Sequence, residues 1–203
     1  MHANGDYGSW IRLVSARATG EVSFSEYKYE NNTSPKLLDI IDVPLLDAAP
    51  HNHQTENHVI DAKTRWLKQG KLTWNDLEKL RDQPESLWIN SDHTSVTPGS
   101  FDCMSAAEAA TLNNSLLLIR QEHFTLEVGR NSFTGKRNYR GSFDYKGTHH
   151  NFSVTDPLAR DKPEGDYPLN DVYLCISLTE PYENDGRCHK LVAAIIRNPP
   201  LGA

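Results

Sequence analysis

Apolar and polar residues alternate through much of the segment from Ser115 to Ile196. Phe124, Leu126 and Val128 are separated by single residues, which is the period-two pattern of a strand with one buried face. The segment predicts five strands, at residues 115–130, 136–147, 149–156, 171–180 and 188–196. Five consecutive strands with no long helix between them are typical of a small closed or partly closed barrel.

The connections between these strands also have a clear pattern. Lys146 and Gly147 predict a tight turn between the second and third strands. The third and fourth strands are joined by the sequence DPLARDKPEGDYPLN, where barrels of the OB type commonly have a helix. Because Pro163 and Pro168 lie inside this connection, we expect a loop with at most one helical turn.

The first half of the chain has shorter patterns. SWIRLVSA and PKLLDIIDVPLL predict strands, and Thr73–Asp82 predicts a helix with Thr73 as its N-cap and Asp76 completing a capping box. Residues 105–113 predict a second short helix capped by Ser105. We therefore expect a mostly β, α+β protein with an N-terminal module at residues 1–104 and a C-terminal module at residues 105–203.

Composition narrows the class of protein. Charged residues make up 24% of the chain and the net charge is −6, so the whole molecule does not attract nucleic acid or an anionic membrane. The longest apolar run, Leu191–Ile196, is too short to span a bilayer. No signal peptide is visible, and three cysteines fit a reducing compartment. These features predict a cytoplasmic protein without a membrane partner.

Several phrases resemble a known family. They are WIRLVS, PKLLDIIDVPLL, KLTWNDL, SFDYKGTHHNFSVTDP, DVYLCISLTEP and KLVAAII. Together they are similar to the bacterial dual OB-containing domain family, over nearly the whole chain. The resemblance implies two OB-like β-barrel modules and nucleic-acid or nucleotide recognition in bacterial phage defence, and it supplies no catalytic residues. The short polar start, Met1–Ser9, leaves open whether the first barrel is complete.

A local basic excess lies in the second module. Between Arg120 and His150 there are six Lys and Arg residues and three Asp and Glu residues, which gives this stretch a charge of +3 in a chain of net charge −6. OB-folds bind single strands with cations along the phosphates and aromatic rings against the bases. The candidate nucleic-acid-binding residues are Lys136, Arg137, Arg140, Lys146 and Tyr139, together with Trp10 and Arg12 in the first module. The alternative is that Tyr139, which shares its parity with Phe143 and Tyr145, faces the barrel core.

Two other clusters suggest metal binding. PHNHQTENHVID contains His51, His53 and His58, and its imidazoles and carboxylates are zinc ligands. Its spacing matches no metalloenzyme pattern, and the alternative is a surface loop. Cys175 and Cys188, with His189, could face each other across a hairpin, although free cysteines are more often buried hydrophobic residues.

The leading hypothesis is a non-enzymatic module that recognises nucleic acid or a nucleotide, without a cofactor. The chain has no GxSxG, P-loop or GxGxxG motif that would indicate nucleophilic catalysis or nucleotide hydrolysis. The first alternative is a protein-interaction or regulatory subunit, with a protein partner or a second copy filling a free strand edge. The second alternative is a metal-dependent hydrolase that uses the histidine cluster.

Overall fold

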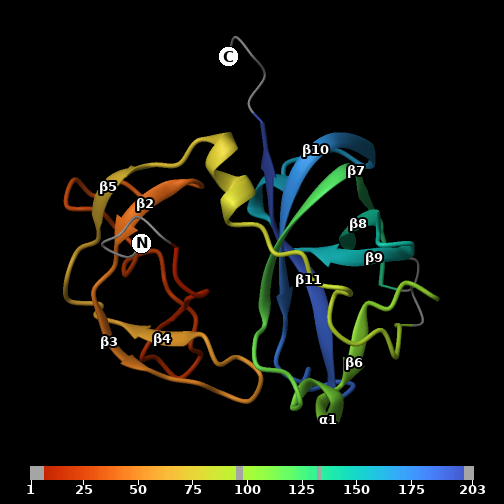
Figure 1. The fold of residues 1–203 in the computed structure, drawn as a ribbon, viewed down its shortest axis with the longest axis horizontal. Helices are drawn as coiled ribbons and strands as arrows, with labels where there is room; N and C mark the ends of the chain where they lie inside the picture. Colours follow the sequence, from red (N-terminus) through yellow and green to blue (C-terminus); the bar gives the residue numbers. More distant parts are fainter. Residues whose placement is uncertain (1–6, 95–97, 132–133, 199–203) are drawn as a thin grey trace. The chain divides into compact units, whose positions relative to one another are not determined.

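Most of the regular structure is β-strand, and it is divided into two units between Leu80 and Arg81 (Figure 1). The computed structural model describes residues 7–94, 98–131 and 134–198. The predicted boundary between residues 104 and 105 lies within strand β6 (Cys103–Ser105). Leu87 and Trp88, upstream of that boundary, pack in the core of the C-terminal unit.

The N-terminal unit contains two small sheets in its described part. Strand β4 (Asn57–Ile60) pairs in parallel with β1 (Arg12–Val14) and antiparallel with β3 (Leu45–Ala48). Strands β2 (Asp39–Asp42) and β5 (Leu67–Lys71) form a separate antiparallel pair. Tyr29 and Trp66 join in an isolated bridge and, with Ile60, form a small buried core. The described strands of this unit therefore do not form one continuous ladder.

The predicted helix after β5 is present but short. It is a 3₁₀-helix, η1 (Trp74–Lys79), and the Asp76 carboxylate accepts hydrogen bonds from the Thr73 backbone N–H at 2.8 Å and from its hydroxyl at 2.6 Å. The capping interaction expected from the sequence is thus confirmed. Buried Leu77 attaches the helix to the unit.

The C-terminal unit contains a closed five-stranded barrel. Its strands are β7 (Leu116–Arg130), β8 (Arg137–Tyr145), β9 (Thr148–Val154), β10 (Gly165–Leu178) and β11 (Arg187–Arg197). Strand β7 pairs antiparallel with both β8 and β10, β8 with β9, and β10 with β11. The parallel pairing of β9 with β11 closes the ring. This five-stranded arrangement confirms the OB-type barrel predicted from the alternating pattern.

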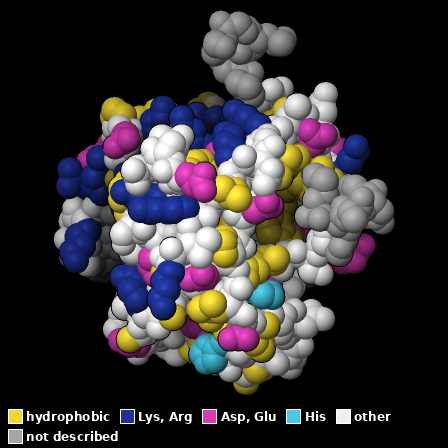
Figure 2. Space-filling model, turned by 90° about the vertical axis from the view of Figure 1, so that its left-hand side faces the viewer, with side chains coloured by type: hydrophobic (Ala, Val, Ile, Leu, Met, Phe, Trp, Pro, Cys, Tyr) yellow, Lys and Arg dark blue, Asp and Glu magenta, His cyan; other side chains and the backbone are white. Residues whose placement is uncertain are grey.

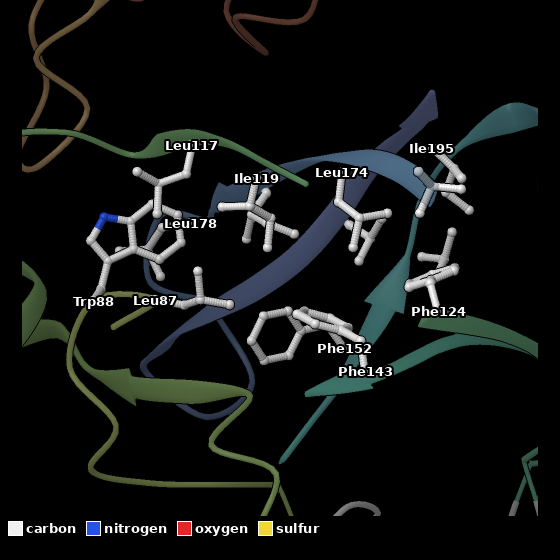
Figure 3. Packing of buried hydrophobic residues seen from close by; sticks show 14 of the residues in the cluster. Leu87, Trp88, Leu117, Ile119, Phe124, Phe143, Phe152, Leu174, Leu178 and Ile195 are labelled. Carbon is white, nitrogen blue, oxygen red and sulfur yellow. The ribbon is translucent and has the colours of Figure 1, made fainter. Parts of the chain in front are cut away.

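The barrel core follows the predicted parity. Phe124, Phe143, Phe152, Leu174 and Ile195 are buried and lie together inside the ring of strands (Figure 3). The interior is tight at Gly141, where an added Cβ atom would lie 2.6 Å from two ring carbons of Phe124. A side chain at position 141 therefore has no room on this inner face.

The connections also match their sequence signals. Lys146 and Gly147 both have positive φ, at 46° and 81°, in the two-residue turn from β8 to β9. The β9–β10 connection contains one short 3₁₀-helix, η2 (Pro157–Ala159), as the prolines predict. Strand β10 nevertheless begins before Pro168, which lies opposite Thr125. Because β11 pairs with β10 only from Val172 onward, Pro168 lies where β10 has a single neighbour and tolerates a missing N–H.

The segment before β7 contributes two small elements. Strand β6 extends the sheet by pairing with the start of β11. It leads into helix α1 (Ala106–Ala109), where Ser105 and Glu108 form a capping box. The predicted cap is confirmed, and the helix is shorter than the predicted range. No helix in the described part of the chain is long and apolar enough to cross a membrane.

Candidate functional site

One end of the C-terminal barrel carries cations stacked on tyrosine rings. The Arg137 guanidinium carbon lies 5.5 Å from the Tyr139 ring centroid, and the Lys162 ammonium lies 5.5 Å from that of Tyr167. We call these four residues the basic–aromatic cap. Strand β8 supplies Arg137 and Tyr139, β10 supplies Tyr167, and the β9–β10 connection supplies Lys162. Such pairs contribute about 0.5–1 kcal/mol each at exposed sites and fix where the cation lies.

Backbone carbonyl groups hold the basic–aromatic cap in place. The Tyr167 hydroxyl donates to the Pro163 carbonyl oxygen at 3.0 Å, and Tyr139 donates to that of Arg160 at 3.4 Å. The Arg137 guanidinium donates to the Lys162 carbonyl oxygen. Both tyrosine rings are partly buried against the core. The alternative in which Tyr139 faces the barrel core is therefore correct for the inner side of its ring.

Lys136 extends the basic end. It is exposed, it directly precedes β8, and its ammonium makes no ion pair within the described part of the chain. Nearby Arg130 is paired with Glu164 at 2.7 Å and contributes less net charge. Lys136, Arg137 and Lys162 therefore provide the cations at this end of the barrel.

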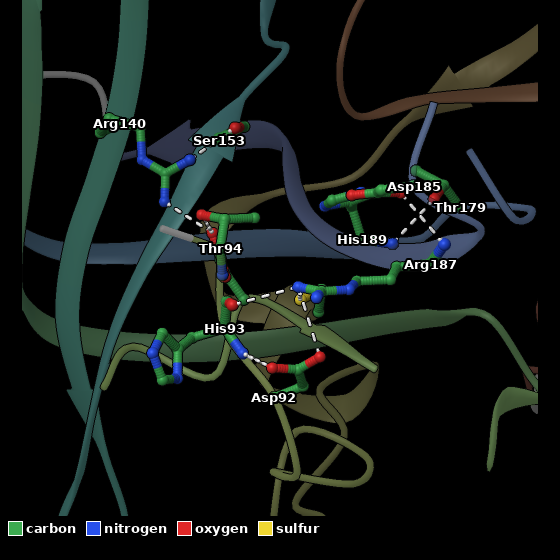
Figure 4. Close-up of polar contacts among 11 residues, drawn as sticks. Asp92, His93, Thr94, Arg140, Ser153, Thr179, Asp185, Arg187 and His189 are labelled. Carbon is green, nitrogen blue, oxygen red and sulfur yellow. Dashed lines mark hydrogen bonds and ion pairs between the residues drawn. The ribbon is translucent and has the colours of Figure 1, made fainter. Parts of the chain in front are cut away.

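Arg140 lies in an internal network instead. Its guanidinium donates to the Asn151 side chain at 2.7 Å, to Ser153 at 2.7 Å and to the Asp102 carboxylate at 3.1 Å. Asp102 also accepts from the Thr94 backbone N–H at 2.7 Å and from its hydroxyl at 2.8 Å. Figure 4 shows Arg140 reaching from β8 toward Ser153 and Thr94. Arg140 thus attaches the segment around Thr94 and Asp102 to the barrel wall.

A groove lies on the outer face of β8, β9 and β11. A hollow of about 270 Å³ is lined by Asn138, Ser153 and His189, among others. A second hollow, of about 650 Å³, is formed by the β10–β11 loop, Thr179–Asp185. The two share His189 and Leu191 and so adjoin each other. OB-folds bind oligonucleotides on the face of their second and third strands and in the loops at its two sides.

The two ends of this groove differ in charge. The β10–β11 loop contributes Glu180, Glu183 and Asp185, and Asp185 lies 3.1 Å from His189. At the opposite end, Asn131 of the β7–β8 loop lines the hollow, and its backbone N–H donates to the carbonyl oxygen of Lys136 at 2.8 Å. A phosphate chain is therefore favoured at the β7–β8 end and disfavoured at the β10–β11 end.

The remaining nucleic-acid candidates lie elsewhere. Lys146 is in the turn at the other end of β8, and its ammonium lies 3.2 Å from Glu85. Trp10 and Arg12 belong to the N-terminal unit. Arg12 lies 3.9 Å from the Glu56 carboxylate, and its side chain is 24% exposed. The structure therefore brings together only Lys136, Arg137 and Tyr139 from the predicted set.

The three histidines of the predicted metal cluster lie in different environments. His51 is exposed, His53 is buried, and His58 has its Nδ1 atom 2.9 Å from the Glu56 carbonyl oxygen. Among the described residues, no group of three His, Cys, Asp or Glu side chains has a metal-binding arrangement. The metal-ligand prediction thus gains no geometric support from those residues, and the hydrolase alternative stays a prediction.

The cysteines are separated as well. Cys175 lies opposite Ala194, whereas Cys188 lies opposite Met104. The expected pairing of these thiols across the hairpin is therefore wrong, because the β10–β11 register places Leu178 opposite Lys190. Burial raises the pKa of the Cys188 thiol to about 11, so this side chain is a protonated thiol at neutral pH.

Lys190 and His150 are titratable side chains that are buried in the barrel. The Lys190 ammonium donates to the Ile89 carbonyl oxygen at 2.9 Å and to the Asn90 side chain at 2.8 Å, and desolvation lowers its pKa to about 7. The His150 ring lies 5.0 Å from the Phe152 ring, and desolvation lowers its pKa to about 4. Both groups cost free energy when charged.

Some residues of the candidate site had no signal in the sequence. Lys162 and Tyr167 lie in the connection predicted as a loop, outside the stretch with the basic excess. Asn138 is a single polar residue on a strand, and the sequence indicated His189 only as a metal-ligand candidate. The closed ring of strands brings Asn138 and His189 to one hollow, which the sequence spacing does not indicate.

Comparison with known proteins identifies a family. A family model described as a dual OB-containing domain matches residues 2–195 of the chain. Comparisons with curated proteins and with solved structures give no match. The family match spans residues of both units and agrees with the topology of the C-terminal barrel.

Proposed function

Because the chain belongs to the dual OB-containing domain family, we propose that its C-terminal barrel is a non-enzymatic module that binds single-stranded nucleic acid. OB-folds of this kind combine a positively charged track for the backbone with surfaces that contact bases. The groove and the basic–aromatic cap provide these two parts on one barrel, and strand β8 supplies Asn138 to the groove and Arg137 to the cap.

The observation that carries the proposal is the pair of stacked cations. Arg137 over Tyr139 and Lys162 over Tyr167 are held at fixed positions, so binding a phosphate costs little side-chain entropy. Lys136 adds a third cation next to them. The phosphates of the nucleic-acid backbone contact these cations, because phosphate contacts usually fix the position of the bound strand.

The groove contacts the bases. Asn138 and Ser153 supply amide and hydroxyl groups that hydrogen-bond base edges, and His189 supplies a ring at the far side. The acidic β10–β11 loop repels phosphates, so the backbone leaves the groove before this loop. The bound strand is consequently short, at the low end of the roughly 4–16 nucleotides that OB-folds cover.

Fluorescence anisotropy with labelled single-stranded DNA, single-stranded RNA and duplex DNA tests the proposal. We expect the single strands to bind more tightly than the duplex, with affinity falling as salt rises. Each phosphate contact contributes about −0.7 to the slope of log K against log salt for single strands. The double variant Arg137→Ala/Lys162→Ala should therefore reduce that slope by about 1.4.

Lys146→Ala is the matched control, because it removes a cation from the opposite end of β8 and should leave binding unchanged. Circular dichroism at 25 °C checks that each variant is folded. Absence of salt-sensitive binding to any strand, or equal losses in the double variant and in Lys146→Ala, would contradict the proposal.

A further inference from the structure

The N-terminal unit has a hollow of its own beside strands β2 and β5, with a volume of about 500 Å³. Tyr29 and Trp66 line it, together with Asn31, Lys36, Asp39 and Lys68. We propose that this hollow binds a small phosphate-bearing ligand of nucleotide size. The inference concerns a different unit from the C-terminal barrel and does not depend on the function proposed for that barrel.

The Asp39 carboxylate accepts its hydrogen bonds from groups within the protein. Its side chain is 2% exposed and accepts hydrogen bonds from the Tyr29 hydroxyl at 2.8 Å and from the Lys36 backbone N–H at 3.0 Å. The Lys68 ammonium also donates to it and is the main reason that the pKa of Asp39 falls to about 2. Asp39 is thus a fixed carboxylate that positions Lys68 and has little capacity left for a cation.

The hydrogen-bonding capacity that remains in the hollow consists mainly of donors. Lys68 keeps two ammonium N–H groups beyond its bond to Asp39, and its side chain is 44% exposed. The Lys36 ammonium has no ion pair among the described residues. Asn31 accepts from the Thr33 hydroxyl at 2.6 Å through its carbonyl oxygen, which leaves its amide N–H groups for a ligand.

Three donor side chains, Lys36, Lys68 and Asn31, line the hollow. A site with these donors selects an acceptor-rich ligand, and phosphate oxygens are the strongest such acceptors. Trp66 also belongs to the lining; it is 5% exposed, and its buried indole Nε1–H has no acceptor within the described part of the chain.

The size of the hollow and the charges around it narrow the class of ligand further. Figure 2, which faces the N-terminal unit, shows Lys and Arg side chains interspersed with Asp and Glu. A volume of about 500 Å³ is within the range of roughly 300–1,000 Å³ for small-molecule sites, so it suits a mononucleotide better than phosphate alone. Glu30 also lines the hollow and opposes an anion. The phosphate can come from a free nucleotide or from the 5′ end of a strand, and the chemistry of recognition is the same for both.

Isothermal titration calorimetry on the full chain tests the site. The probes are inorganic phosphate, the four nucleoside 5′-monophosphates, and a trinucleotide with and without a 5′-phosphate. We expect at least one monophosphate to bind more tightly than inorganic phosphate, and the unphosphorylated trinucleotide not to bind in this hollow. Binding of the phosphorylated trinucleotide as well would support the phosphate site and assign it to strand ends.

Two variants of exposed residues separate recognition from folding. Lys36→Ala should weaken monophosphate binding about tenfold, as expected for loss of one charge-assisted hydrogen bond. Glu30→Gln should strengthen it. Lys71→Ala is the matched control, because Lys71 is exposed on β5 and does not line the hollow.

Binding that is unaffected by both Lys36→Ala and Glu30→Gln would overturn the proposal, as would the absence of binding by every monophosphate. Arg137→Ala/Lys162→Ala should leave monophosphate affinity unchanged. That result distinguishes failure of this site from failure of strand binding by the C-terminal barrel.

Discussion

Because the Lys190 side chain is buried, the stability of the C-terminal unit changes with pH in the neutral to alkaline range. Replacing it by methionine, Lys190→Met, removes the charge while keeping an unbranched chain of similar length. The pKa of Lys190 falls from 10.5 to about 7 because burial penalises the charged form. At about 1.4 kcal/mol per pKa unit, this lowering corresponds to roughly 5 kcal/mol. The free energy of unfolding is reduced by that amount at pH values at which Lys190 is charged in the folded unit.

The sign of the pH dependence follows from proton binding. Between pH 7 and 10.5 the unfolded chain holds the Lys190 proton and the folded chain does not, so the free energy of unfolding rises with pH. From pH 7.5 to 9.5 we expect the native protein to gain about 2–3 kcal/mol relative to Lys190→Met. The variant also loses the hydrogen bonds to Ile89 and Asn90, which lowers its stability about equally at every pH.

Thiol labelling in urea measures this unit alone. All three cysteines, Cys103, Cys175 and Cys188, belong to the C-terminal unit. Cys103 and Cys188 are buried, so their reaction with a short pulse of thiol reagent at each urea concentration reports when that unit opens. Native and variant proteins are compared at the same pH. Lys146→Met, which removes an exposed ammonium, should follow the native pH dependence. Parallel curves for the native protein and Lys190→Met would refute the reasoning.

Two further changes test the barrel interior. Because the pKa of His150 is lowered from 6.5 to about 4, acid should destabilise the native unit between those values, and His150→Phe should remove up to about 3 kcal/mol of that loss. The free energy of unfolding in urea is measured at pH 4.5 and 7 for both proteins, and an equal loss in the native protein and in His150→Phe would contradict this. Gly141→Ala should cost about 1–3 kcal/mol by overpacking against Phe124, measured by urea unfolding at pH 7. Gly129→Ala, whose added Cβ would lie 3.4 Å from its nearest neighbour, should cost less, and equal costs would show that the core absorbs the methyl group.

The barrel could be predicted from the sequence because each of its strands has a strong local signal. Phe124, Leu126 and Val128 give β7 its period of two, and the turn at Lys146 and Gly147 sets the register of β8 and β9. The N-terminal unit was harder, because its strands have three to five residues and little alternation. Short strands depend on tertiary packing, which a local pattern does not contain.

The candidate site was predicted only in part, for a physical reason. Lys136, Arg137 and Tyr139 are consecutive or nearly so, and the local charge excess indicates them. Arg140 shares that signal, yet its guanidinium binds Asp102, which lies 38 residues away in the sequence. Partners at such separations are set by the closed barrel, so charge counts over a short window do not distinguish an internal ion pair from a ligand contact.

The parallel pairing of β9 with β11 has a consequence for how the polypeptide reaches this structure. Strand β11 forms ladders with β9, β10 and β6, so the ring remains open until this fifth strand is in place. Pairings between distant segments slow folding, and unpaired strand edges promote aggregation. Without β11, strands β7 to β10 can form only an open sheet in the order β10, β7, β8, β9, with β10 and β9 as its unpaired edges. A variant that weakens the pairing of β11 should therefore promote aggregation through these edges.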